Sequence, residues 1–291
     1  MSSMSTTSPS SFTVDAVMVD VRQRTIDRTL LIPTGIAPID NGGGLRRKEL
    51  SGILGYTGQG KTTLARTLAY NAAMHGSRVL YIPLETTFDE ELAAFQRLHS
   101  HDDWGPGYSS YAETVGRDLT IVMPKETRLW KDIRAAIQAE DAIRPLDLVV
   151  IDSLLLVNPD PTIEDRPRAK LAMAADARQM AHSHNYSIVT PILGNRRGFE
   201  DAEERDGVWD LRGISRHEGL EAILDNCFYV FATPEMVSMG VLKVGACKQH
   251  LDSSIPGVQL RVDFASRMVM PGFESVVQLT EAKAKKFFEF E

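Results

Sequence analysis

Short apolar runs alternate with longer amphipathic stretches through most of this 291-residue chain. Several runs have the predominantly apolar character of strands that are buried on both faces of a parallel sheet: 50–54, 78–84, 119–123, 146–152, 186–193 and 227–232. Helical patterns lie between them, at 63–75, 90–101, 129–142 and 168–185. This alternation predicts an α/β fold with a mostly parallel central sheet flanked by helices.

The pattern changes toward the C-terminus. Apolar runs at 241–247, 258–264 and 267–270 are separated by turn-forming residues, which predicts a C-terminal antiparallel extension of the sheet. Residues 199–219 are polar and rich in turn formers, and a loop of that length inside a domain is usually functional or mobile. Its many carboxylates also fit a solvated charged face.

The ends of the chain differ from this main domain, which we expect at residues 32–275. Residues 1–12 are rich in serine and threonine and predict a disordered leader. Residues 13–31 carry apolar side chains at helical spacing and predict an amphipathic linker helix. The apolar face of that helix packs either on its own domain or on a neighbouring subunit. Residues 276–291 are expected to form a tail.

Composition excludes some classes of protein. With 43% hydrophobic and 24% charged residues, the chain resembles an ordinary globular protein. A net charge of −7 disfavours a protein coated in nucleic acid but leaves room for a local basic patch. Cys227 and Cys247 lack the spacing of a metal site, and we expect a reducing, cytoplasmic compartment. No apolar run reaches the length of a membrane helix, about eighteen residues, so no membrane partner is expected.

The strongest chemical signal is GYTGQGKT, at 55–62, which fits G-x-x-x-x-G-K-[ST]. In such a loop the backbone N–H groups surround phosphates, the lysine reaches the β- and γ-phosphates, and the hydroxyl binds Mg²⁺. An apolar run before it and an Ala/Leu-rich helix after it favour this interpretation over a glycine turn that binds nothing. The predicted binding residues are Gly55, Thr57, Gly58, Gln59, Gly60, Lys61, Thr62 and Thr63.

Two carboxylates follow apolar runs. Glu85 comes after 78–84 and Asp152 ends 146–152. Because ligands bind beyond the carboxyl ends of parallel strands, both side chains are expected near the phosphates. Asp152 is the candidate Mg²⁺ ligand. Taken alone, Asp152 would better fit a strand-ending carboxylate or a helix cap, and its pairing with the glycine loop favours the metal role.

The order of several motifs resembles the RecA-type ATPase domain of DnaB-like replicative helicases, from about residue 32 to 273. The motifs are Ile32-Pro33-Thr34-Gly35 with Asp40, GYTGQGKT, YIPLE ending at Glu85, VVIDS with Asp152, GNRR at 194–197, DLRGIS at 210–215, Leu224-Asp225, and ACKQH at 246–250. The predicted helix at 13–31 lies where that family has a linker helix docking on the adjacent subunit.

The resemblance implies a RecA-like P-loop NTPase that acts as a DNA helicase in replication. Its homo-oligomer would be a hexamer around single-stranded DNA, with ATP and Mg²⁺ between subunits and a primase or helicase loader as a further partner. Lys61 would hold the phosphates, and Thr62 and Asp152 would position Mg²⁺. Glu85 would polarise the attacking water. Lys248 would reach the γ-phosphate of the neighbouring subunit. The channel-facing, DNA-binding residues would be Arg196, Arg197, Arg212 and Arg216.

Three departures from the family pattern bear on activity. Leu193 stands where the family has a γ-phosphate-sensing glutamine, and Asn195 is its possible replacement. His250 replaces the arginine that follows the trans-acting lysine, which weakens stabilisation of the transition-state charge. The family's N-terminal helical domain has no counterpart in this sequence. A recombination or annealing ATPase that does not unwind DNA, and a nucleotide-switched assembly protein with slow ATPase, therefore stay open as alternatives.

Overall fold

The computed structural model describes residues 30–36, 39–40, 43–99, 113, 115–159, 164–214, 219–249, 257–263 and 268–269. Within these ranges a central sheet has the strand order β11-β10-β9-β8-β3-β7-β6-β4-β5. Its parallel part comprises β3 (Leu50–Gly55), β4 (Val79–Pro83), β5 (Leu119–Ile121), β6 (Leu148–Asp152), β7 (Ser187–Leu193) and β8 (Asn226–Phe231). The predicted mostly parallel sheet is confirmed.

The antiparallel extension is also present. It consists of β9 (Val241–Lys248), β10 (Val258–Asp263) and β11 (Met268–Val269), each paired antiparallel with its neighbour, and β9 joins the parallel part through β8. A short hairpin of β1 (Leu31–Ile32) and β2 (Leu45–Arg46) stands apart from this sheet. The C-terminal prediction is therefore confirmed over the described residues.

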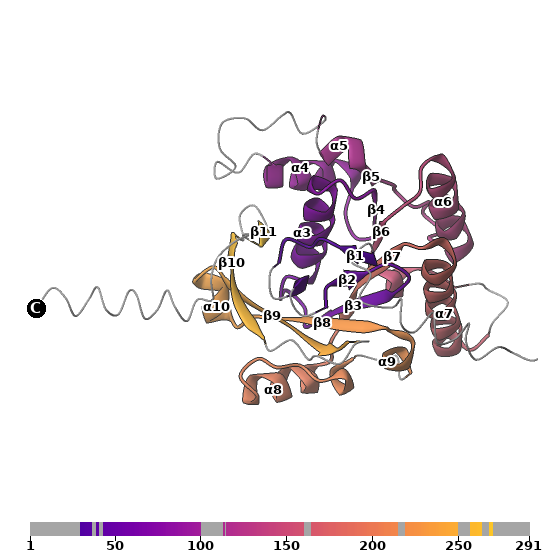
Figure 1. The fold of residues 1–291 in the computed structure, drawn as a ribbon. Helices are drawn as coiled ribbons and strands as arrows, with labels where there is room; N and C mark the ends of the chain where they lie inside the picture. The colour runs from indigo at the N-terminus through magenta and orange to yellow at the C-terminus, as the bar shows by residue number, and fades with distance from the viewer. Residues whose placement is uncertain are drawn as a thin grey trace, which may run out of the picture.

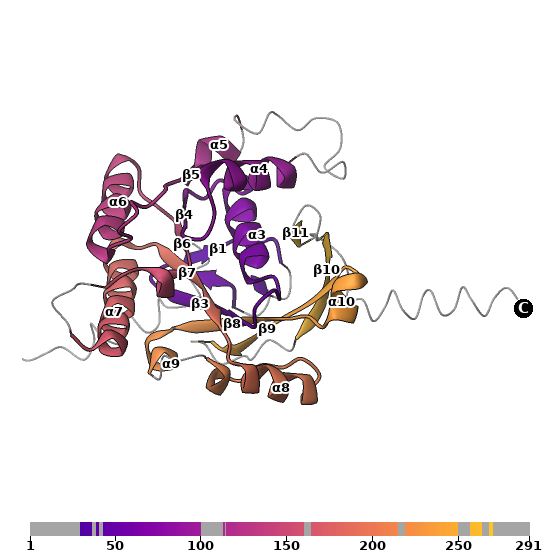
Figure 2. The ribbon, with the colours of Figure 1, turned by 180° about the vertical axis from the view of Figure 1, so that it is seen from behind.

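Helices cover both faces of the sheet. Figures 1 and 2 show α3 (Lys61–Met74), α4 (Phe88–His99) and α5 (Val115–Asp118) on one side, with α6 (Trp130–Ile143) and α7 (Arg166–His184) on the other. Successive strand residues serve opposite layers: Val150 packs with the α3 side, and Val149 and Ile151 with the α6–α7 side. Burial on both faces explains why these strands are mostly apolar.

Shorter elements complete the chain. They are η3 (Leu154–Leu156), α8 (Arg196–Glu204), η4 (Leu211–Gly213), α9 (Leu220–Ile223) and α10 (Pro234–Ser238). The prediction of one long loop at 199–219 is wrong over its described part, because 199–204 continue α8 and 211–213 form η4. Phe199 and Ala202 lie one turn apart and pack in the core, which stabilises a helix despite its polar composition.

Strand β7 keeps its place in the sheet although it contains Pro191. Its pairing with β3 extends through Leu193, whereas its pairing with β6 ends at Val189. The missing proline N–H therefore falls beyond the last β6–β7 pair, and no ladder hydrogen bond on that side is lost. Beyond this point the hydroxyl of Thr190 accepts from the backbone N–H of Leu154 at 2.9 Å.

Candidate functional site at the carboxyl edge of the sheet

The carboxyl ends of β3, β4, β6 and β7 bring the glycine loop, Glu85 and Asp152 to one edge of the sheet. Gly55 at the end of β3 is paired with Leu193 at the end of β7, and Asp152 at the end of β6 is paired with Pro83 at the end of β4. Glu85 follows Pro83 by two residues. Residues separated by nearly a hundred positions in the sequence are thus neighbours here, as the parallel-sheet argument predicts.

The glycine loop has the strand–turn–helix geometry expected of a phosphate site. Gly58 and Gly60 have positive φ values of 77° and 88°, a conformation that glycine adopts without strain. A Cβ atom on Gly58 would meet nothing within 4 Å, so the tip of the loop is open. Lys61 then begins the 14-residue helix α3, whose unpaired first-turn N–H groups favour an anion.

Gln59 braces this loop from inside. Its side-chain oxygen accepts from the backbone N–H of Tyr56 at 2.8 Å, and its amide group donates to the backbone oxygen of Ala232 at 3.1 Å. The side chain is buried. Gln59 therefore ties the loop to the end of β8, and its side chain is already used within the protein.

Lys61 is held at the mouth of the loop. Its Nζ donates to the backbone oxygen of Tyr56 at 2.8 Å. Burial lowers the pKa of Lys61 to about 8, although the nearby charges of Asp152 and Glu85 oppose that shift. An anionic phosphate chain would favour the charged form of this lysine, so the residue fits the phosphate-binding role.

Asp152 and Thr62 face each other across the sheet edge. The Thr62 hydroxyl donates to Oδ1 of Asp152 at 3.3 Å, and the Tyr81 hydroxyl donates to Oδ2 at 3.0 Å. Burial raises the pKa of Asp152, while these two hydrogen bonds act in the opposite direction. A hydroxyl and a carboxylate oxygen are ligands that Mg²⁺ accepts together with water and phosphate oxygens. The pair therefore fits the predicted metal role.

Glu85 is exposed beside these groups. The residue before it is fixed, because the N–H of Leu84 donates to the backbone oxygen of Asp152 at 2.8 Å. The influence of Glu85 on the pKa of Lys61 places its charge near the phosphate-binding lysine. An exposed carboxylate next to the loop is suited to orienting a water molecule.

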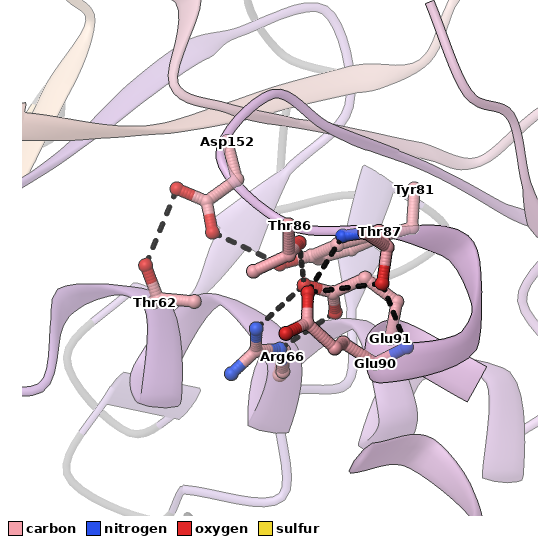
Figure 3. A network of polar contacts seen from close by, with 8 residues as sticks. All are labelled: Thr62, Arg66, Tyr81, Thr86, Thr87, Glu90, Glu91 and Asp152. Carbon is pink, nitrogen blue, oxygen red and sulfur yellow. Dashed lines mark hydrogen bonds and ion pairs between the residues drawn. The ribbon is translucent and has the colours of Figure 1, made fainter. Parts of the chain in front are cut away.

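A buried network beside this edge was not anticipated from the sequence. Arg66 lies one turn after Thr62 on α3 and forms a two-pronged contact with Glu91 of α4, with distances of 2.7 and 2.5 Å (Figure 3). Thr86, directly after Glu85, donates to the same carboxylate. An arginine within an Ala/Leu-rich helix is the sequence signal for such a partner, since a buried charge requires one.

Lys248 lies toward the opposite edge of the sheet. It is the last residue of β9, and it is paired with Cys227 near the start of β8. Cys227 is level with Gly52, about 10 Å before the glycine loop along the strand direction. The Lys248 Nζ donates to the backbone oxygens of Glu221 and Leu224 at 2.6 and 2.5 Å. Lys248 is therefore directed away from the phosphate site of its own chain.

Three of the candidate DNA-binding arginines lie on α8 and η4: Arg196, Arg197 and Arg212. Arg196 pairs with Glu200 at 3.0 Å, and Arg212 makes two contacts with Asp210, each at 3.1 Å. The hydrogen bonds from Arg212 lower the pKa of Asp210. Arg197 is exposed in the first turn of α8. Two of these arginines thus already have carboxylate partners on the same surface.

Asn195 has a structural role. Its side-chain oxygen caps α8 by accepting from the N–H of Gly198 at 2.7 Å, and its amide group faces the backbone oxygens of Arg212 and Ile214 at 3.3 Å. Both ends of the side chain are used in joining α8 to η4. Asn195 is therefore not positioned as a replacement for the sensing glutamine, and Leu193 is left half-exposed next to the start of the glycine loop.

A stack of aromatic rings connects the glycine loop to α8. Tyr56 stacks on Phe199 with ring centroids 5.3 Å apart, and Phe199 stacks on Phe231 at 5.7 Å. These residues come from the loop, from α8 and from the end of β8. The sheet edge that carries the glycine loop (the nucleotide edge) and the arginine-bearing helix α8 are thus in direct contact. The side chains that make this contact were not identified from the sequence pattern.

Comparisons with known proteins agree with the observed fold. A family model described as "ATPase: KaiC" matches residues 32–102. A solved structure of an ATPase domain has a TM-score of 0.73 at 17% identity, covering 91% of this chain and 100% of that chain. The fold is that of a RecA-type ATPase domain. A structure of a DnaB-like replicative helicase and its interactions with primase has a TM-score of 0.70 at 16% identity, with 90% of this chain and 67% of that chain covered.

No similar sequence was found among curated proteins. The RecA-type fold extends over nearly the whole chain, beyond the segment that the family model matches. None of the helices in the described ranges is long and apolar enough to cross a membrane. The interpretations of Arg216 and His250, of the leader at 1–12, of most of the linker helix at 13–31 and of the tail at 276–291 concern residues outside those ranges.

Proposed function

We propose that this chain is an ATP-hydrolysing, DnaB-like helicase or translocase that acts on single-stranded DNA as a hexameric ring in DNA replication. The observation that carries the proposal is the meeting of Lys61, Thr62, Glu85 and Asp152 at one edge of a RecA-type sheet, with Lys248 directed away from that edge. This arrangement suits a site completed by a second subunit.

The proposed reaction is cleavage of the γ-phosphate by water, in which positioning and electrostatics supply most of the acceleration. The backbone of the glycine loop and Lys61 bind the phosphates of ATP. Thr62 and Asp152 hold Mg²⁺, which supplies positive charge toward the phosphate oxygens when bound. Glu85 orients the attacking water and draws its proton.

Lys248 of one subunit acts on the ATP of its neighbour. Its ammonium has three N–H donors, and two of them serve the carbonyls of Glu221 and Leu224. The third remains for a γ-phosphate oxygen, where a positive charge stabilises the transition state. This division of labour requires an oligomer, because the register of β9 holds Lys248 away from its own loop.

The proposed DNA contacts come from Arg196, Arg197, Arg212 and Arg216. Such contacts neutralise phosphates without reading the sequence. A primase or helicase loader is a proposed partner, supported by the likeness to a helicase whose solved structure concerns primase. The chain is proposed to work in the cytoplasm.

One observation favours a second function, a nucleotide-switched assembly protein with slow hydrolysis. Leu193 occupies the strand end where a γ-phosphate sensor is expected, and Asn195 is committed to capping α8. Both proposals predict nucleotide-dependent oligomers. Only the motor predicts hydrolysis that single-stranded DNA stimulates.

The deciding experiment compares ATP turnover and strand displacement on a forked DNA duplex for the unmodified chain and for Glu85→Gln. The motor proposal expects DNA-stimulated turnover and unwinding, with Glu85→Gln binding ATP but hydrolysing it on the order of a hundredfold more slowly. DNA-stimulated turnover without unwinding would fit an annealing ATPase. An absence of DNA binding at low salt with ATP and Mg²⁺ would contradict the motor proposal, and undiminished turnover in Glu85→Gln would contradict the role of Glu85.

A further inference from the structure

The Arg66–Glu91 ion pair joins the phosphate-binding helix to the helix that follows Glu85. Both side chains are almost completely buried, at 3% and 1% exposed. Arg66 donates through Nε and Nη2 to the two carboxylate oxygens of Glu91. Burial of two charges carries a large desolvation cost, and the geometry here is the two-pronged arrangement that best compensates it.

The carboxylate of Glu91 has a further contact, and this contact leads to the active-site edge. The Thr86 hydroxyl donates to Oε1 of Glu91 at 2.5 Å, the same oxygen that accepts from Nη2 of Arg66 (Figure 3). Thr86 is the residue directly after Glu85. A chain of contacts therefore extends from α3, through Glu91, to the backbone beside the candidate water-orienting group.

The segment around Glu85 is thus fixed on both sides. On the N-terminal side, Leu84 is buried and its N–H donates to the backbone oxygen of Asp152. On the C-terminal side, the next residue, Thr86, is held by Glu91, and Thr87 then caps α4. Thr87 forms a reciprocal cap with Glu90, with distances of 2.8 and 3.3 Å between each backbone N–H and the other side chain.

Glu85 is the exposed residue between these anchors. An exposed side chain has no packing of its own to define its direction, so its placement depends on the backbone on either side. Arg66 lies one turn after Thr62 on the same helix. The network therefore fixes the position of Glu85 relative to the helix that binds the phosphates. Glu85 and the metal-binding pair are thereby placed by one rigid unit.

We propose that Arg66, Glu91 and Thr86 are positioning residues that hold Glu85 at the distance from the α3 phosphate site that water activation requires. This inference rests on the proposed role of Glu85 in ATP hydrolysis. None of the three residues touches the substrate in the proposed site, and their effect is exerted through the backbone of Glu85. A shift of about 1 Å at such a group is enough to cost on the order of a hundredfold in rate.

The sharpest test removes only the last contact of the network. Thr86→Val deletes the hydroxyl and leaves the Arg66–Glu91 pair intact, whereas Thr86→Ser keeps the hydroxyl and serves as its matched control. Turnover is measured with ATP, Mg²⁺ and single-stranded DNA, and nucleotide affinity with a fluorescent ATP analogue. We expect Thr86→Val to lower kcat on the order of tenfold with affinity within about twofold, and Thr86→Ser to remain near the unmodified rate.

A second variant separates positioning from stability. The double substitution Arg66→Met with Glu91→Leu replaces the ion pair by apolar side chains, a change that often leaves stability unaltered or improved. We expect its melting temperature to stay within a few degrees of the unmodified protein or to rise, and its kcat to fall as in Thr86→Val. The inference would be overturned if either Thr86→Val or the folded double variant had the same kcat as the unmodified protein. It would also be overturned if Thr86→Val lowered nucleotide affinity and left kcat unchanged.

Glu85→Gln, measured alongside, separates the role of Glu85 in hydrolysis from the positioning role of the network. If Glu85→Gln is inactive and Thr86→Val is fully active, the positioning network is refuted while the role of Glu85 stands. If Glu85→Gln hydrolyses ATP at the unmodified rate, the proposed function fails and the inference fails with it.

Discussion

The nucleotide edge and the arginine-bearing surface of α8 and η4 are built in different ways. At the nucleotide edge, side chains from β4, β6, α3 and α4 make long-range contacts that are mostly buried, such as Arg66 with Glu91 and Tyr81 with Asp152. On α8 and η4, Arg196 and Arg212 are exposed and pair with carboxylates four and two residues away.

This difference has energetic consequences. Breaking one partner of a buried ion pair costs about 3–5 kcal/mol, whereas an exposed pair contributes about 0–1 kcal/mol. The nucleotide edge is therefore held in one arrangement, and the arginines of α8 and η4 exchange partners at little cost. Arginines that exchange carboxylate partners at little cost, beside a fixed phosphate site, would suit the proposed gripping and releasing of a DNA backbone.

The largest effect is expected at Lys61. Lys61→Ala removes the side chain that neutralises the β- and γ-phosphates, and we expect ATP turnover to fall by about a thousandfold or more. A phosphate-release assay with single-stranded DNA measures this. Lys125→Ala is the matched control, because Lys125 is an exposed lysine paired with Asp132 at 3.7 Å, away from the glycine loop. Equal losses in the two variants would contradict the assignment.

The pH dependence of ATP affinity provides the next effect. The pKa of Lys61 is about 8 in the free protein, and bound phosphates favour the charged form. Below pH 8 the lysine is already charged, and above it binding must take up a proton. Affinity should therefore fall by up to about tenfold per pH unit above pH 8. Calorimetry at pH 7, 8 and 9 measures this, and a constant affinity would refute it.

Much of the fold was predictable because strands that are buried on both faces appear as apolar runs in the sequence. The predominantly apolar runs indicated the parallel strands, including β7 despite Pro191, and the glycine spacing indicated the loop before α3. The carboxylates at 85 and 152 were found because parallel strands end at a common edge.

Other features depend on contacts between residues far apart in the chain, and the local sequence indicates them only weakly. The partner of Arg66 lies 25 residues away on another helix. Helix α8 was predicted as a loop because it buries few apolar side chains, chiefly Phe199 and Ala202. Its start was nonetheless indicated, since asparagine is a favoured cap and Asn195 precedes it. The inward direction of Gln59 could not be inferred from a motif that specifies only spacing.

A smaller effect is expected on the arginine-bearing surface of α8 and η4. Glu200→Gln releases Arg196 from its partner, and we expect single-stranded DNA to bind a few-fold more tightly at low salt. Glu203→Gln is the matched control, because it removes one exposed negative charge from the same helix without releasing Arg196. Fluorescence anisotropy with labelled DNA compares them. Equal gains in both variants would mean that net charge alone is responsible.

The central claim is that each hydrolysis site is shared between two subunits. Glu85→Gln subunits lack the water-orienting group but retain Lys248, and Lys248→Ala subunits have the opposite defect. Each variant alone should be nearly inactive. In an equimolar mixture that assembles at random, about a quarter of the interfaces combine an intact Glu85 with an intact Lys248.

The ATP turnover of this mixture, measured after subunit exchange with Mg²⁺ and single-stranded DNA, is the most direct test. Recovery to roughly a quarter of the unmodified activity is the result that the shared site predicts. Turnover that stays at the level of the separate variants at every mixing ratio, although mass photometry shows mixed oligomers, would contradict it.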